Sequence, residues 1–167
     1  MVFHATPPYD GSLAECTVHD AAFAHPVPDG VSDEAAAMVE PLSVGLWACR
    51  KADVTLGDRV LITGCGPIGL MCLLAARARG ARDITVVDLN PERLERARAL
   101  GARVVDSRHE RFDEREYDVL LECSGVASVT LAGMRALARG ARAVLVGMGG
   151  DTVEPVSYTH LTLPTKA

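Results

Sequence analysis

A glycine-rich turn between a predicted strand and a predicted helix constrains the fold of this chain more than any other feature. The short apolar run at residues 59–63 predicts the strand, and the motif Gly64-Cys65-Gly66-Pro67-Ile68-Gly69 follows it directly. Residues 70–79 then predict a helix, and Asp88 closes the next predicted strand. A G-x-G-x-x-G motif in this context is typical of a dinucleotide-binding βαβ unit.

The glycines and the acidic residue have separate expected roles. Gly64 permits the tight turn, Gly66 lets the backbone approach a pyrophosphate, and Gly69 allows close packing of helix on strand. The helix N-terminus offers unpaired N–H groups and the positive end of its dipole to the phosphates. Asp88 is expected to accept hydrogen bonds from the adenosine ribose and to repel a 2′-phosphate, which favours NAD over NADP. Arg93 could attract that phosphate, so NADP is the alternative.

Strands and helices continue to alternate along the chain, which predicts an α/β fold with a parallel sheet of about five strands. After the first strand, further strands are expected at residues 84–88, 103–105, 118–123 and 142–146. Helices are expected at residues 32–39, 41–52, 70–79, 91–100 and 126–139, with Ser32 and Asn90 as N-caps and with Pro41 and Pro91 as first helical residues. Residues 1–30 are expected to form turns and short strands, the strands at 14–19 and 23–27.

Composition and charge exclude several functional classes. The 167 residues carry a net charge of −5 without a basic run, which argues against nucleic-acid binding. No apolar stretch is long enough to cross a membrane, and the start of the chain, MVFHATPPYDG, lacks the features of a signal peptide. A cytoplasmic location is therefore expected. The five cysteines are scattered without a C-x-x-C pair, which indicates reduced thiols.

The last twelve residues, VSYTHLTLPTKA, differ in composition from the rest of the chain. Arginine far outnumbers lysine elsewhere, whereas this segment has a lysine, three threonines and no arginine. It resembles the translated read-through of a sequencing adapter. We therefore expect residues 156–167 to be a non-native tail and the chain to be a truncated fragment.

Several stretches of the chain resemble one enzyme family. The stretch VEPLSVGLWACRKADVTLGDRVLITGCGPIGLMCLLAARARGARDITVVDLNPERL, together with ATPPYDG, LLECSG and VLVGMG, is similar to the zinc-dependent medium-chain dehydrogenases of the alcohol dehydrogenase superfamily. The similarity is greatest to the sorbitol (polyol) dehydrogenase branch. It implies a Rossmann NAD-binding domain at 41–155, truncated before its sixth strand, and at 1–40 a remnant of a GroES-like β-rich catalytic domain. It also implies a homo-tetramer for the full-length parent.

The motif and the resemblance together assign roles to individual residues. Glu40 matches the glutamate beside the catalytic zinc, which reaches the metal or the substrate directly or through water. Phe3 and Thr6 match positions that line the polyol pocket. The expected cofactor contacts are Gly64, Gly66, Pro67, Ile68, Gly69, Asp88, Arg93, Cys123, Ser124, Val146, Gly147 and Met148. Cys65 is not expected to be a nucleophile, although its place at a helix N-terminus predicts a lowered thiol pKa.

The resemblance implies an activity for the parent enzyme: NAD-dependent, zinc-assisted oxidation of a sugar alcohol to a ketose by hydride transfer. Threonine or another secondary alcohol is the alternative substrate, and a non-catalytic NAD-binding module is the alternative of a different class. The family's principal zinc ligands, a Cys and a His-Glu pair, belong to a region with no counterpart here. The chain is therefore expected to supply the cofactor-binding half and to be inactive alone.

Overall fold

The computed structural model describes residues 11–112 and 116–149. The chain divides into two units, Met1–Ala36 and Ala37–Ala167. The expected non-native tail lies outside the described residues.

The described part of the first unit contains little regular structure. It holds a 3-10 helix, η1 (Ala21–Phe23), and most of the short helix α1 (Asp33–Ala37). The strands expected at 14–19 and 23–27 are wrong, because residues 11–30 contain no strand and are all exposed. A strand needs a neighbouring strand to bond its backbone N–H and C=O groups, and the described residues of this unit provide none.

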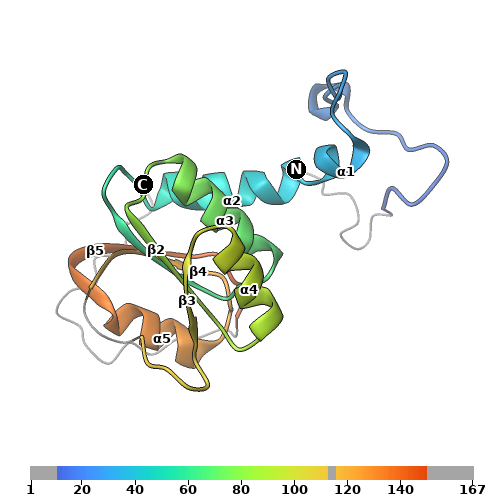
Figure 1. Cartoon of the computed structure of the whole chain (residues 1–167). Helices are drawn as coiled ribbons and strands as arrows, with labels where there is room; N and C mark the ends of the chain where they lie inside the picture. The colour runs from blue at the N-terminus through green and yellow to red at the C-terminus, as the bar shows by residue number, and fades with distance from the viewer. Residues whose placement is uncertain (1–10, 113–115, 150–167) are drawn as a thin grey trace. The chain divides into compact units, whose positions relative to one another are not determined.

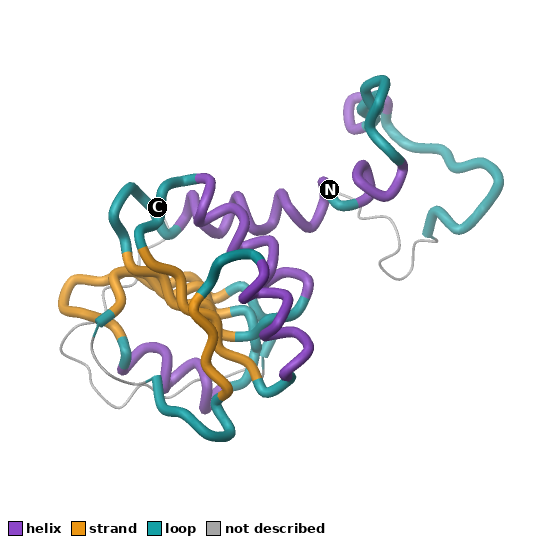
Figure 2. The backbone as a smooth tube through the Cα atoms, viewed as in Figure 1, coloured by secondary structure: helices purple, strands orange, loops and turns teal. Residues whose placement is uncertain are grey.

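The second unit is built on a five-stranded parallel sheet with the strand order β3-β2-β1-β4-β5 (Figures 1 and 2). The strands are β1 (Arg59–Thr63), β2 (Asp83–Asp88), β3 (Arg103–Asp106), β4 (Tyr117–Glu122) and β5 (Leu137–Leu145). Strands β2 and β3 are added in turn on one side of β1, and β4 and β5 are then added in turn on its other side. The prediction of a parallel α/β sheet with about five strands is confirmed.

Helices cover both faces of this sheet (Figure 1). They are α2 (Val39–Lys51), α3 (Pro67–Ala78), α4 (Pro91–Ala99) and α5 (Ala127–Arg135). Alternate residues of β1 face opposite sides: Val60 and Ile62 pack with α2, α3 and α4, whereas Leu61 packs with Ala136 at the end of α5. Among the described residues, no helix has the length and apolar character that a membrane crossing requires.

Local signals account for the start of several helices. Asn90 accepts hydrogen bonds from two first-turn N–H groups of α4 at 2.9 and 3.2 Å, and Pro91 is the first residue of that helix, as expected. The Ser32 hydroxyl likewise accepts a first-turn N–H of α1 at 3.3 Å. Pro41 differs from the expectation, because α2 begins at Val39 and the proline lies inside its first turn.

The boundary between α5 and β5 differs from the prediction. The helix ends at Arg135 rather than at residue 139, and β5 begins at Leu137 rather than at residue 142. Leu137 pairs with Tyr117, the ladder is then interrupted around Gly140 with its φ of +75°, and regular pairing resumes at Arg142. This early start depends on a partner strand that is distant in the sequence, so the local helical pattern could not reveal it.

The parallel arrangement places the carboxyl ends of all five strands at one edge of the sheet. The glycine motif follows β1, Asp88 ends β2, Cys123 and Ser124 follow β4, and residues 146–148 follow β5. The strand order also reverses at this edge, between β1 and β4. Most of the expected cofactor residues are therefore carried to one place by the topology.

Candidate functional site

The three motif glycines have different surroundings at the start of α3, which Pro67 opens. Gly64 has a φ of +88°, and a Cβ there would lie 2.8 Å from the backbone nitrogen of Ser124. A Cβ on Gly69 would lie 2.0 Å from the carbonyl oxygen of Gly64, so only glycine permits this packing. A Cβ on Gly66 would meet no atom within 4 Å. The Gly66 backbone is therefore open to an approaching ligand, whereas protein atoms crowd the other two glycines.

The carboxylate of Asp88 ties the glycine motif to the end of β2. Its Oδ2 accepts a hydrogen bond from the backbone N–H of Cys65 at 2.6 Å. Its Oδ1 accepts from the N–H groups of Leu89 and Asn90, both at 2.8 Å. A carboxylate has about four lone-pair sites, so with three N–H groups bound, capacity remains for about one further donor, such as a hydroxyl group of a ligand. One negative charge is thus held beside the motif, where ribose recognition is expected.

Cys65 lies inside the turn with its side chain buried. Its thiol donates to the carbonyl oxygen of Arg93 at 3.1 Å. Burial, reinforced by the charge of Asp88, raises the pKa of the Cys65 thiol to about 11. The expectation of a lowered pKa is therefore wrong, because the removal of water from the buried thiolate outweighs the lowering effects of the neighbouring arginines and of a backbone hydrogen bond. Cys65 fills space in the turn and is unsuited to act as a nucleophile.

A buried carboxylate with no motif of its own organises the end of β4. Glu122 is only 1% exposed. Its Oε1 accepts from the backbone N–H groups of Ser124 and Gly125 at 2.8 and 3.1 Å, and from the Thr63 hydroxyl at 3.3 Å. The Ser124 hydroxyl also donates to it. The only signal in the sequence is a single acid within an apolar run, and our sequence-based candidates do not include it.

The segment after β5 packs tightly against the turn after β4. Val146 and Gly147 donate their N–H groups to the backbone carbonyl of Glu122 at 2.7 and 2.9 Å. A Cβ on Gly147 would lie 2.4 Å from the backbone nitrogen of Gly125. The side chain of Met148, in contrast, is 99% exposed. The structure therefore brings the expected residues after β4 and β5 together at the same edge as the glycine motif.

Two further expected residues adjoin the glycine motif: Ile68 belongs to it, and the backbone carbonyl of Arg93 accepts the Cys65 thiol. Ile68 is partly buried against the core, and Arg93 is exposed in the first turn of α4. Glu40 is exposed in the first turn of α2. Phe3 and Thr6 lie outside the described residues.

A catalytic metal does not fit this part of the chain. Within residues 11–112 and 116–149, no group of three or more His, Cys, Asp or Glu side chains is placed to hold a metal ion. Catalytic zinc needs about three protein ligands. Glu40 by itself cannot meet that requirement.

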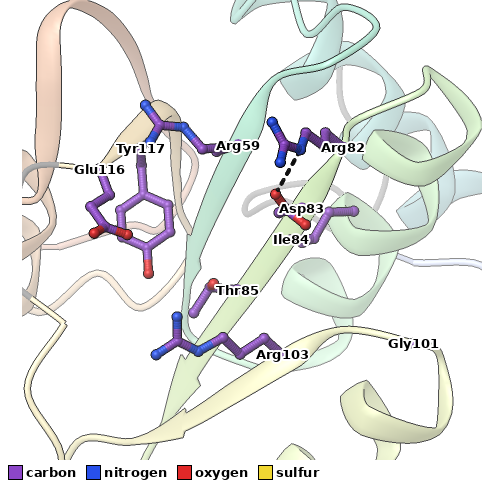
Figure 3. Close-up of a pocket in the computed structure, with 9 residues that line it drawn as sticks. All are labelled: Arg59, Arg82, Asp83, Ile84, Thr85, Gly101, Arg103, Glu116 and Tyr117. Atoms are coloured by element: carbon purple, nitrogen blue, oxygen red, sulfur yellow. Dashed lines mark ion pairs between the residues drawn. The ribbon is translucent and has the colours of Figure 1, made fainter.

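A hollow of about 260 Å³ lies at the opposite edge of the sheet, where the strands begin (Figure 3). Its lining residues are Arg59, Arg82, Asp83, Ile84, Thr85, Gly101, Arg103, Glu116 and Tyr117. Arg59 makes two side-chain hydrogen bonds to Asp118 at 3.0 and 3.1 Å, and Arg82 pairs with Asp83 at 3.3 Å. These acids neutralise two of the arginines, and no expected site residue lines the hollow. The candidate site is therefore the carboxyl edge.

Comparisons with known proteins point to one family. The profile of the family described as zinc-binding dehydrogenase matches residues 67–166. Sorbitol dehydrogenase of Ovis aries is 43% identical over 162 residues, which cover 90% of this chain and 46% of that protein. A solved oxidoreductase/dehydrogenase of unknown specificity from Escherichia coli matches with a TM-score of 0.87 and 32% identity, covering 92% of this chain and 47% of that one. L-idonate 5-dehydrogenase from Escherichia coli matches with a TM-score of 0.83 and 29% identity, and the match covers 90% of this chain and 46% of that one. The chain spans about half the length of the relatives it matches.

Proposed function

The chain belongs to the zinc-binding dehydrogenase family, and from this premise we propose that its α/β unit binds NAD as the cofactor half of a polyol dehydrogenase. One observation carries the proposal: the open backbone of Gly66 lies beside the bound carboxylate of Asp88, where the strand order reverses. Open parallel sheets bind their ligands outside the carboxyl ends of the strands at such a reversal.

The pyrophosphate is proposed to lie at the N-terminus of α3. The first N–H groups of a helix lack partners within the helix, and the dipole adds partial positive charge there. The space beside Gly66 lets phosphate oxygens come close to the backbone.

The adenosine ribose is proposed to bind to Asp88. This carboxylate already accepts three backbone N–H groups, which orient it before any ligand arrives. A 2′-phosphate would bring a second negative charge against it, so NAD is the proposed cofactor. Arg93, in the first turn of α4, is the residue that would favour NADP instead.

The nicotinamide half is proposed to lie against the turn after β4 and the segment after β5. Cys123, Ser124 and residues 146–148 would form its floor, and the buried Glu122 holds both segments in position. When bound, NAD supplies the hydride acceptor of the reaction. The role of this chain is to bind and orient that cofactor.

The whole-enzyme activity is proposed from the relatives. Their names include sorbitol dehydrogenase and L-idonate 5-dehydrogenase, which supports NAD-dependent oxidation of a polyol to a ketose in a longer parent. In that parent Glu40 would lie beside the zinc, and Phe3 and Thr6 would line the polyol pocket of a cytoplasmic homo-tetramer. Because the described residues lack a zinc ligand set, we expect this chain alone to bind the cofactor without oxidising a polyol.

Calorimetry of the purified 167-residue chain with NAD tests the proposal. We expect one-to-one binding by the wild type and a loss of affinity of at least about tenfold in Gly66→Ala, because a methyl group would occupy the phosphate approach. Urea unfolding serves as the control, since the Gly66→Ala side chain meets no atom and should cost at most about 1 kcal/mol at this N-cap position. A folded wild type that does not bind NAD, or a Gly66→Ala variant that binds equally well, would overturn the proposal.

A further inference from the structure

Two thiols that are far apart in the sequence lie in contact behind the glycine-rich turn. Cys72, in α3, is fully buried, and Cys123, directly after β4, is half-buried. Their Sγ atoms are 3.7 Å apart, and the Cys123 thiol donates to the Cys72 sulfur. A disulfide has an S–S distance of ~2.05 Å, so the sulfurs would have to approach each other by roughly 1.7 Å to form one.

The glycine motif holds the two backbones close together. Gly69 lies one helical turn before Cys72, so both residues face the same side of α3. A Cβ on Gly69 would lie 3.8 Å from the Cβ of Cys123. A Cβ on Gly64 would lie 2.9 Å from the carbonyl carbon of Cys123. Because both glycines lack a side chain, α3 and the end of β4 approach closely enough for the sulfurs to meet.

The neighbouring buried thiols are directed toward other acceptors. Cys49 donates to the carbonyl oxygen of Cys72 at 3.8 Å, and Cys65 donates to that of Arg93 at 3.1 Å. Burial raises the pKa of Cys49 to about 12 and that of Cys65 to about 11, so both stay protonated at neutral pH. Within the contacting pair, the hydrogen bond from Cys123 lowers the pKa of Cys72 and raises that of Cys123.

We propose that Cys72 and Cys123 are a redox-active thiol pair, which hydrogen peroxide or a related peroxide converts to a disulfide linking α3 to the end of β4. A thiolate of the pair attacks one peroxide oxygen, the O–O bond breaks, and a sulfenic acid and hydroxide form. The second thiol then attacks the sulfenic sulfur, the S–O bond breaks, and water leaves. In total, the two thiols lose two electrons and two protons, and one peroxide becomes two waters.

This linkage is a modification site that the cofactor-binding proposal does not require. The two residues are 51 positions apart, so the disulfide would close a large loop that contains β2, α4, β3 and β4. It would also fix the Cys123–Ser124 peptide, which packs on Gly64, to helix α3. The disulfide can be detected directly, whether or not NAD binds.

The test uses the full chain with Cys16→Ser, which removes the exposed thiol that could cross-link molecules. The protein is treated with hydrogen peroxide, its free thiols are counted, and its tryptic peptides are mapped without reduction. Cys72 and Cys65 share the peptide 60–77, whereas Cys123 lies on the peptide 116–135. Fragment-ion sequencing of the linked peptide therefore identifies the sulfur, and Cys65→Ser, Cys49→Ser and Cys72→Ser are compared in the same background.

We expect the four remaining thiols to fall to two, with peptides 60–77 and 116–135 joined and with the joining reversed by dithiothreitol. The linkage should persist in Cys65→Ser and Cys49→Ser and disappear in Cys72→Ser. A linkage that fragment ions place on Cys65, or that survives Cys72→Ser, would overturn the proposal. Four unchanged thiols under the same treatment would overturn it as well.

Discussion

Asp88 has both a structural role and a proposed role in cofactor preference. Its carboxylate accepts a hydrogen bond from the glycine motif and is also the proposed partner of the ribose. Asp88→Asn removes the charge but keeps an oxygen that can accept the Cys65 N–H. We expect the preference for NAD over NADP to shrink by ~1–3 kcal/mol, since the repulsion of the 2′-phosphate is relieved. Calorimetry with both dinucleotides measures this change.

The matched control for this substitution is Asp83→Asn, at the amino end of the same strand. Asp83 is exposed and pairs with Arg82, at the edge of the sheet opposite the proposed site. Its substitution should leave both affinities unchanged. An unchanged NAD/NADP ratio in Asp88→Asn would contradict the role we assign to that carboxylate.

Asp106, which is in register with Asp88 at the end of β3, makes stability depend on acid pH. The Arg108 guanidinium donates hydrogen bonds to both of its carboxylate oxygens and lowers the pKa of Asp106 to about 2. An acid whose folded pKa lies below its unfolded value of about 3.9 stabilises the fold above that value, and this contribution is lost as pH falls toward the folded pKa. Urea unfolding should show the wild type slightly more stable than Asp106→Asn at pH 6, with the two converging between about pH 4 and pH 2. A gap that stays constant down to pH 2 would argue against this ion pair.

At the scale of elements, sequence-based prediction succeeds where the signal is local. Asn90 and Pro91 mark the start of α4 because capping involves only neighbouring residues. The glycine motif is found for the same reason, since strand, turn and helix follow one another. The start of β5 at Leu137 is missed because it depends on pairing with Tyr117. These two residues are far apart in the sequence and become neighbours only when the sheet forms.

The part of the site that comes from tertiary structure could not be predicted in the same way. Glu122 is recognisable only once Ser124 and Gly125 donate to it from the turn beyond β4. The contact between Cys72 and Cys123 joins two elements that are separated by two further strands. The lowered pKa expected for Cys65 fails because its burial depends on the packing of the whole unit.

The junction of β1 and α3 gives a prediction that separates packing from binding. In Gly69→Ala the new Cβ would lie 2.0 Å from the Gly64 carbonyl oxygen, so the turn must shift. We expect a loss of ~1–3 kcal/mol in the free energy of unfolding, as for other overpacked sites, together with weaker NAD binding. Gly66→Ala should weaken NAD binding without a comparable loss in the free energy of unfolding, because the new Cβ meets no atom. Equal stability of the two variants in urea would contradict this division of roles.

At the scale of the whole molecule, the sheet of the second unit is covered by helices on both faces, and β3 and β5 are its two edge strands. Helices α2, α3 and α4 lie on one face and α5 on the other (Figure 1). Among the described residues, β5 pairs only with β4, so its other side has no partner strand. Leu145, near the carboxyl end of this strand, is 53% exposed. An edge strand with unpaired N–H and C=O groups is a template for pairing with another chain.

We therefore expect the chain to self-associate through β5, and Leu145→Lys to weaken that association. A lysine on an edge strand opposes pairing because a second strand would have to desolvate its charge. In the variant, the association no longer buries the leucine side chain, which costs about 1 kcal/mol. The dissociation constant for self-association should therefore rise about fivefold. Sedimentation at several concentrations measures the shift, with Leu56→Lys as the control. Leu56 is 88% exposed but lies outside the strands, so its substitution should leave the self-association unchanged. If both variants dissociate to the same extent, association would depend on general surface hydrophobicity, and the β5 edge would not be its site.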